Sequence, residues 1–309
     1  MIPFLILVFS VIVLILVSSS FFIYLFVFHR KKEGDPGEVM DDPQYKVYGE
    51  ETRAMVDKLR ARAFEEVHII SFDGLRLFGR WYEGKKDSPV AVLCHGYRGS
   101  AFRDFSGGSD IFLSLGWNVL LIDQRAHGKS EGSTITFGVK EKYDALDWVD
   151  YARERKKGAP IFLVGISMGG ATVLMASAMA EERGIKGIAA DCPYSSPYEI
   201  ISKVMVDKGL KPSLLMPLVS LSAFLFGHFR LKSESAAEAV EKSSLPILII
   251  HGLDDRFVPD YMSRGIYERS KGNVEYETFP EAGHGLSYMV DRKRYVDTTV
   301  RFFSSLLES

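Results

Sequence analysis

Residues 161–170 read IFLVGISMGG, an uninterrupted apolar run that ends in a tight glycine–serine–glycine turn. The apolar run predicts a buried strand, and the small and apolar residues 171–176 predict a helix after it. This is the G-x-S-x-G nucleophile elbow in its strand–turn–helix context. Glycine is required at positions 165 and 169 because the turn strains the serine backbone and brings main chain close on both sides. We therefore predict that the Ser167 hydroxyl is held out at the edge of a sheet.

Similar apolar runs recur on both sides of the elbow, at residues 90–94, 119–122, 188–190 and 247–250. Runs without polar alternation are typical of parallel strands that are buried on both faces. Helix candidates alternate with them, at residues 103–115, 139–157, 168–183 and 260–270. This alternation predicts an α/β fold with a mostly parallel sheet flanked by helices. Ahead of it, residues 67–71 and 75–82 are predicted to form an antiparallel pair around a tight turn.

Residues 193–245 interrupt the alternation with far more chain than a crossover between strands requires. We predict that they form an inserted cap, much of which is strongly apolar. A second membrane span is the alternative interpretation, but Lys211, Pro217 and His228 leave too short an uninterrupted apolar stretch.

The N-terminal residues 2–28 contain no charged side chain. As a helix they would extend about 40 Å, more than the roughly 30 Å of bilayer hydrocarbon, so they predict a transmembrane anchor. A cleaved signal peptide is the alternative, but it would have basic residues before a shorter apolar run. Here the basic residues follow the run, at positions 29–32. Because positive residues tend to stay on the cytoplasmic side, we expect the rest of the chain to lie in the cytoplasm.

The overall charge argues against a nucleic-acid-binding protein. The chain has 38 Lys and Arg residues against 40 Asp and Glu residues, without the basic excess that such a surface needs. The two cysteines, Cys94 and Cys192, each lie in an apolar run and lack metal-ligand spacing. We interpret both as reduced thiols in the core.

Four motifs in this order carry a resemblance to a known family. They are HGYRGS at residues 95–100, DQRAHGKS at 123–130, the elbow itself, and HGLDDRFVP at 251–259 followed by a Gly-His pair at 283–284. The chain resembles the α/β-hydrolase superfamily, and within it the esterases similar to serine aminopeptidases, lysophospholipases and monoacylglycerol lipases. The resemblance implies one α/β-hydrolase domain over residues 67–309. The hydropathy and composition of the preceding residues predict an anchor at 1–29 and a linker with a leading helix at 30–66.

The resemblance also implies the roles of particular residues. Ser167 would be the nucleophile, His284 the general base, and Asp255 the acid that orients the histidine. Asp255 is preferred over Asp254 because the family pattern H-G-x-x-D-x-x-V-P places the acid there. The backbone N–H groups of Tyr97 and Met168 would form the oxyanion hole.

Other histidines in these motifs are His95, His127 and His251. We expect them to hold loops in place by hydrogen bonding, since the proposed triad already contains its base.

Together these features predict a membrane-anchored serine hydrolase that cleaves acyl or lipid-like carboxylic esters through an acyl-enzyme. No metal or organic cofactor is implied. The apolar cap is expected to form a hydrophobic wall beside the triad, which favours acyl chains. We also expect the anchor to be separable from catalysis, so that deletion up to about Gly34 leaves a soluble, active enzyme. A peptidase, an acyltransferase or a non-catalytic binding protein that retains the fold are the alternatives.

Overall fold

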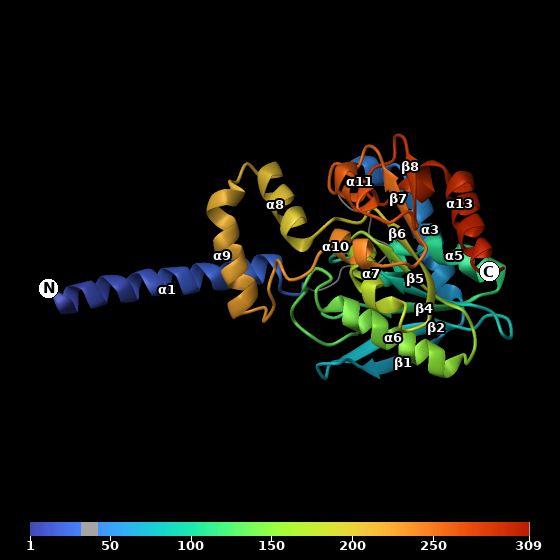
Figure 1. Ribbon diagram of the computed structural model, residues 1–309, viewed down its shortest axis with the longest axis horizontal. Helices are drawn as coiled ribbons and strands as arrows, with labels where there is room; N and C mark the ends of the chain where they lie inside the picture. The colour runs from blue at the N-terminus through green and yellow to red at the C-terminus, as the bar shows by residue number, and fades with distance from the viewer. Residues whose placement is uncertain (32–42, 309) are drawn as a thin grey trace.

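The centre of the molecule is an eight-stranded sheet with the strand order β1-β2-β4-β3-β5-β6-β7-β8. A computed structural model describes residues 1–31 and 43–308 (Figure 1). The strands are β1 (Glu65–Ile70), β2 (Arg76–Tyr82), β3 (Val90–Cys94), β4 (Asn118–Asp123), β5 (Ile161–Ile166), β6 (Ile185–Asp191), β7 (Ile247–Gly252) and β8 (Val274–Phe279). Only β2 runs antiparallel to its neighbours β1 and β4, and the remaining pairs are parallel. The predicted mostly parallel α/β fold is therefore confirmed.

Helices cover both faces of this sheet. In chain order they are α1 (Ile2–Val27), α2 (Pro43–Lys46), α3 (Gly49–Ala61), α4 (Ala101–Asp104), α5 (Gly108–Leu115), α6 (Glu141–Arg155), α7 (Met168–Ala180), α8 (Pro197–Asp207), α9 (Pro212–Leu225), α10 (Ala236–Lys242), α11 (Asp260–Glu268), α12 (Ser287–Val290) and α13 (Arg292–Ser305). One apolar core joins the sheet to α6, α7, α10 and α11, and a second joins its other face to α3, α4, α5 and α13.

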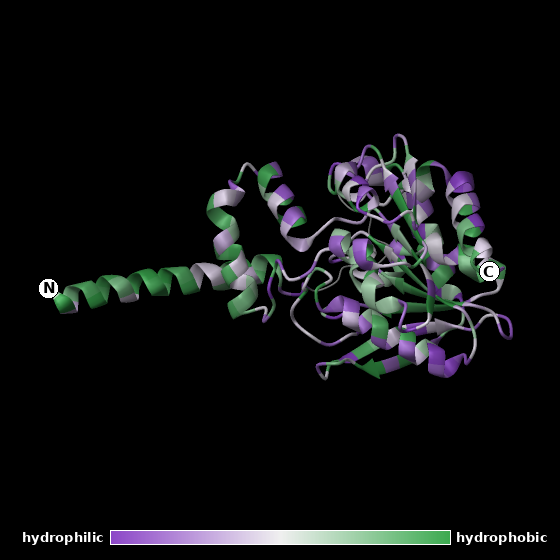
Figure 2. Cartoon of the chain, in the orientation of Figure 1, coloured by the Kyte–Doolittle hydropathy of each residue, from purple (hydrophilic) through white to green (hydrophobic). Residues whose placement is uncertain are grey.

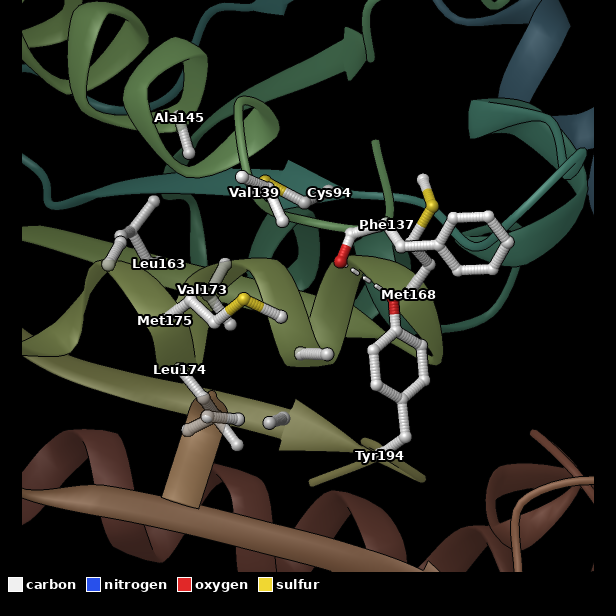
Figure 3. Close-up of a cluster of buried hydrophobic side chains, with 14 of the residues drawn as sticks. Cys94, Phe137, Val139, Ala145, Leu163, Met168, Val173, Leu174, Met175 and Tyr194 are labelled. Atoms are coloured by element: carbon white, nitrogen blue, oxygen red, sulfur yellow. Dashed lines mark hydrogen bonds between the residues drawn. The ribbon is translucent and has the colours of Figure 1, made fainter. Parts of the chain in front are cut away.

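The helix after the elbow, α7, is buried on nearly every side. Figure 3 shows its side chains Val173, Leu174 and Met175 packed among residues of the neighbouring elements. In the same cluster, the Tyr194 hydroxyl donates a 3.0 Å hydrogen bond to the Phe137 carbonyl oxygen. Because α7 has no solvent-facing stripe, its sequence is made up mostly of small or apolar residues. This packing fixes the helix whose first residue follows Ser167.

The predicted helix at residues 103–115 is wrong, because the chain there forms two helices, α4 and α5, separated by a short break. Gly107 lies in the break against the ring of Tyr288, and a Cβ atom at this position would lie 2.3 Å from that ring. A continuous helix with larger residues would collide with this tyrosine. The contact comes from a segment far along the chain, so local periodicity did not indicate the break.

The apolar helix α1 extends away from the rest of the molecule for much of its length (Figure 1). It is the one helix among the described residues that is long and apolar enough to cross a membrane. Residues 2–17 are exposed, whereas Phe28 just beyond the helix is fully buried. His29 forms a β-bridge with Thr134, and the Arg30 guanidinium donates to the carbonyl oxygen of Gly128 at 3.2 Å. The carboxyl end of α1 is therefore packed into the globule.

The predicted cap region contains the helices α8, α9 and α10. Helix α10 packs on the sheet side of the globule, against α7 and α11. Helix α9 instead packs against α1, where the Phe226 ring lies 5.2 Å from the ring of Phe21 and 6.1 Å from that of Tyr24. Part of the apolar surface of this region therefore faces α1.

Candidate active site

The turn that carries Ser167 has the strained geometry that the sequence predicted. Ser167 has a φ of 55° and a ψ of −117°, a backbone conformation that non-glycine residues rarely adopt. A Cβ atom at Gly165 would lie 2.2 Å from the Gly169 carbonyl oxygen, and one at Gly169 would lie 1.8 Å from the Cys94 carbonyl oxygen. Both positions therefore exclude any side chain. The turn presses the start of α7 against the ends of β3 and β5.

Three side chains meet in a hydrogen-bonded relay at the carboxyl edge of the sheet. The Ser167 Oγ atom lies 2.9 Å from His284 Nε2, and His284 Nδ1 lies 2.7 Å from Asp255 Oδ2. The other carboxylate oxygen of Asp255 accepts hydrogen bonds from the backbone N–H groups of Phe257 at 2.9 Å and Val258 at 2.8 Å. The three residues expected to form a triad are thus brought together, with His284 between Ser167 and Asp255.

The neighbouring acid, Asp254, is exposed, whereas Asp255 is buried. Burial alone would disfavour the charge of Asp255, but the charges and hydrogen bonds of His284 and His251 hold the pKa of this carboxyl well below its usual range. Asp255 is therefore ionised at neutral pH. This arrangement lets a carboxylate accept a hydrogen bond from a proton on His284 Nδ1, which is the tautomer in which Nε2 can accept a proton from Ser167.

The backbone of Gly96 and Tyr97 approaches Ser167 from the end of β3. A Cβ atom at Gly96 would lie 3.3 Å from the Ser167 Cβ, and the Gly96 N–H donates to Asp104 Oδ2 at 2.8 Å. The Tyr97 ring stacks on Phe137 with 4.8 Å between ring centroids. On the other side, Met168 is the first residue of α7. Both residues expected to supply oxyanion donors therefore flank the serine.

The remaining motif histidines hold main chain in place. His95 Nε2 accepts a hydrogen bond from the Gln124 N–H at 3.1 Å, and His127 Nε2 accepts one from the Arg98 N–H at 3.0 Å. His251 Nε2 lies 2.8 Å from the Val258 carbonyl oxygen. The scaffolding role expected for these side chains agrees with these contacts.

A cavity of about 420 Å³ opens beside Ser167 and His284. This volume lies in the range of small-molecule sites, roughly 300–1,000 Å³. Its walls are mostly apolar or aromatic and include Tyr48, Met55, Phe105, Ile111, Phe112 and Met289. None of its described lining residues belongs to 193–245, so the expectation that the cap forms the wall beside the triad is wrong. Within the predicted cap region, α9 lies against α1 instead, and the wall comes from α2, α3, α5 and the segment around α12.

Two contacts with the histidine loop were not indicated by the sequence. The Tyr45 hydroxyl donates a 2.8 Å hydrogen bond to the carbonyl oxygen of His284. The Gln44 side chain lies so close to Gly283 that a Cβ atom there would collide with it. The short helix α2 thus clamps the loop that carries the proposed base. Tyr45 and His284 are 239 positions apart in the chain, so no local sequence pattern links them.

A buried carboxyl beside the relay was also missed. Asp191 ends β6, its carbonyl oxygen accepts a 2.8 Å hydrogen bond from the Ser167 N–H, and both Asp191 and Tyr295 line the cavity. The Tyr295 hydroxyl lies 3.1 Å from Asp191 Oδ2. Burial raises the pKa of Asp191 to about 6, although the bond to Tyr295 opposes the rise. In the sequence, the only indication that Asp191 could lie at the site was its position at the end of a predicted strand.

The side chains of Cys192, Asp255 and His284 offer potential metal ligands within 4.8 Å of one another. They fit a metal poorly. Asp255 and His284 are already hydrogen-bonded to each other, and burial raises the pKa of the Cys192 thiol far above its usual value. Metal binding would require a thiolate there. These groups are better suited to proton transfer than to coordination.

Comparison with known proteins identifies relatives for most of the globule. The family model described as alpha/beta hydrolase fold matches residues 89–216, which include Ser167 but not Asp255 or His284. The uncharacterised protein YqkD of Bacillus subtilis is 28% identical over 226 residues, which cover 72% of this chain and 74% of that protein. Lysophosphatidylserine lipase ABHD12 of Rattus norvegicus is 26% identical, and the alignment covers 64% of this chain and 50% of that protein. The solved structure of the Pyrococcus furiosus esterase Pf2001 is 25% identical, with a TM-score of 0.66 over 80% of this chain and 93% of that one.

Proposed function

Because the chain has the α/β-hydrolase fold and resembles the esterases and lipases of that superfamily, we propose that it is a membrane-anchored serine hydrolase of acyl or lipid-like carboxylic esters. The observation that carries the proposal is the relay from Ser167 Oγ through His284 to Asp255, with distances of 2.9 and 2.7 Å. A serine hydroxyl is a weak nucleophile until a positioned base takes its proton. This arrangement supplies that base.

In the proposed mechanism, Ser167 Oγ attacks the ester carbonyl carbon while His284 Nε2 takes the hydroxyl proton. The carbonyl oxygen becomes negative and accepts hydrogen bonds from the Tyr97 and Met168 N–H groups. When the C–O bond to the alcohol breaks, His284 returns the proton to the leaving oxygen. Water then attacks the acyl-enzyme by the same route and releases the acid, which regenerates Ser167. Asp255 stays ionised throughout and stabilises the imidazolium.

The substrate class follows from the cavity and the relatives. An apolar cavity beside the nucleophile suits an acyl chain. Two of the similar proteins are named as an esterase and as a lysophosphatidylserine lipase, which supports ester substrates here.

Attachment to a membrane is proposed through α1, whose 26 residues have a mean hydropathy of 2.9 over the most apolar window. The basic residues Arg30 and Lys31 follow it directly, so the catalytic domain is proposed to face the cytoplasm.

The proposal can be tested by labelling with a fluorophosphonate, which reacts covalently with activated serines. Full-length protein in membranes should be labelled, and the variant Ser167→Ala should not. Ser177→Ala is the matched control, because Ser177 is a buried serine within α7, the helix that Ser167 directly precedes. Equal labelling of wild type and Ser167→Ala would refute the assignment of the nucleophile. A panel of esters, thioesters and peptides would then establish which bond the labelled enzyme cleaves.

A further inference from the structure

The part of α1 that projects freely from the globule is too short to cross a bilayer by itself. The exposed stretch, residues 2–17, contains 16 residues. At about 1.5 Å per residue it reaches about 24 Å, against roughly 30 Å of hydrocarbon. Any tilt of the helix increases this shortfall. If α1 spans the membrane, the hydrocarbon therefore extends to the residues from about position 18 onward, where α1 already touches other parts of the chain.

The element that touches α1 at this depth is α9. Phe226, directly after α9, packs its ring against Phe21 and Tyr24 of α1. In Figure 1, α9 crosses α1 steeply instead of running alongside it. With α1 along the membrane normal, α9 lies close to the membrane plane. It is then held at the boundary between hydrocarbon and headgroups, on the side of the globule.

The surface of α9 agrees with this position. Residues 212–227 contain no charged side chain. Leu214 is 71% exposed and Phe224 is 54% exposed, while Met216 and Val219 on the other side of the helix are buried. Figure 2 shows hydrophobic colour along α1 and over much of α9, whereas the outer helices of the globule carry hydrophilic colour. In water this exposed apolar stripe is unfavourable, but in lipid it is not.

Exposed cationic side chains stand at both ends of α9. Lys208 and Lys211 precede the helix, and Arg230 follows it. Basic residues beside a membrane-embedded segment suit the anionic headgroups of a cytoplasmic leaflet. The pattern is that of an in-plane helix with an apolar side in the acyl region and positive charges at the headgroups.

We infer that α9 is a second membrane contact: it lies in the leaflet from which α1 emerges into the globule, with Leu214 and Phe224 in contact with lipid. This inference rests on the membrane anchor of the proposed function and adds to it. The globule is then attached to the bilayer by two crossing helices. Two such contacts fix its orientation at the surface, whereas a single flexible tether would leave the globule free to rotate.

The test uses full-length protein in vesicles of phosphatidylcholine and phosphatidylglycerol that contain lipids with a nitroxide on the acyl chain. Single cysteines at Leu214 and Phe224 carry an environment-sensitive fluorophore. Leu7→Cys in α1 is the control inside the membrane, and Lys293→Cys on α13 is the control outside it. The two native cysteines are buried, so labelled wild type gives the background. Fluorophosphonate labelling of each variant reports whether its fold and its active site are intact.

We expect quenching at Leu214→Cys and Phe224→Cys to be at least half of that at Leu7→Cys, with none at Lys293→Cys. Quenching at Leu7→Cys together with none at Leu214→Cys and Phe224→Cys would overturn the inference and leave the proposed anchor and hydrolase in place. The absence of quenching at Leu7→Cys would overturn the anchor and the inference together, while retained fluorophosphonate labelling would still support the hydrolase.

Discussion

The phenolic oxygen of Tyr97 donates a 2.7 Å hydrogen bond to the main-chain carbonyl oxygen of Val27, the last residue of α1. The neighbouring Arg98 guanidinium donates to the Phe26 carbonyl oxygen, also at 2.7 Å. The loop that carries a proposed oxyanion donor is thus tied to the end of the proposed anchor. These contacts argue against the separable anchor that the sequence alone suggested.

Two truncations should therefore behave differently. Removing residues 1–17 should leave kcat/KM on a short soluble ester within about twofold of the full-length value, because this stretch is exposed. Removing residues 1–30 also takes away Phe28, which is fully buried, and the partners of Tyr97 and Arg98. Loss of a buried phenylalanine costs about 3–5 kcal/mol, so activity and thermal stability should both fall sharply. Assays in detergent compare the three proteins, and equal activity of both truncations would restore the separable anchor.

Substitution of the two adjacent acids, Asp254 and Asp255, should affect activity very differently. Asp255→Asn should lower kcat by about 10⁴-fold, because an amide favours the wrong tautomer of His284. Asp254→Asn should stay within about twofold of wild type, since Asp254 is exposed and outside the relay. Steady-state hydrolysis of a soluble ester measures both. The reverse ranking would identify Asp254 as the orienting acid.

The buried His127 should make the fold sensitive to acid. Burial lowers the pKa of His127 to about 3, whereas the unfolded value is near 6.5. Between these values the unfolded chain binds a proton that the folded chain does not. The free energy of unfolding should therefore fall as the pH drops below about 6.5, by up to about 1.4 kcal/mol per pH unit, until the pH reaches about 3.

Denaturant unfolding of the detergent-solubilised protein at several pH values between 7.5 and 4 would measure this slope. The variant His127→Gln keeps a side-chain acceptor for the Arg98 N–H but does not titrate. Its free energy of unfolding should therefore fall less steeply with decreasing pH, by the contribution of about one bound proton. An unchanged slope in this variant would show that other groups cause the acid sensitivity.

The cavity wall formed by α3 should set the preferred acyl-chain length. Met55 lines the cavity, whereas the adjacent Ala54 is exposed outside it. Met55→Trp should lower the ratio of kcat/KM for a dodecanoyl ester to that for a butanoyl ester by about tenfold, which corresponds to lost burial of about two methylene groups. Ala54→Trp should leave the ratio unchanged. A ratio that Met55→Trp does not alter would show that acyl chains bind elsewhere.

The features that sequence predicted well are those with local causes. The elbow could be located because strand, strained turn and helix are consecutive, and its glycines are required by atoms only a few residues away or in the adjacent strand. The parallel strands were recognisable because both of their faces are buried, which leaves an uninterrupted apolar run. The relay of Ser167, His284 and Asp255 was inferred from motif order, and the structure brings these three side chains within hydrogen-bonding distance.

The features that sequence did not predict depend on contacts between distant segments. Tyr45 reaches the His284 loop across most of the chain, and Tyr295 approaches Asp191 in the same way. From the sequence, the apolar residues of α9 were assigned to the wall of the active site. Hydropathy indicates that a side chain avoids water, but it does not indicate which part of the molecule or which solvent covers that side chain. In the structure α1 occupies the place beside them.

The clamp between α2 and the His284 loop has a consequence for biosynthesis. Tyr45 is translated 239 residues before His284. At about 5–20 residues per second, roughly 12–48 s pass between the two events on the ribosome. During this interval the nascent chain already carries the proposed anchor and then the elbow, but the proposed nucleophile Ser167 does not yet have its proposed base. If α1 inserts during translation, the chain reaches the membrane as an inert precursor. The proposed hydrolytic activity then begins only after the segment that carries His284 has emerged, so the order of translation delays this activity without any inhibitor.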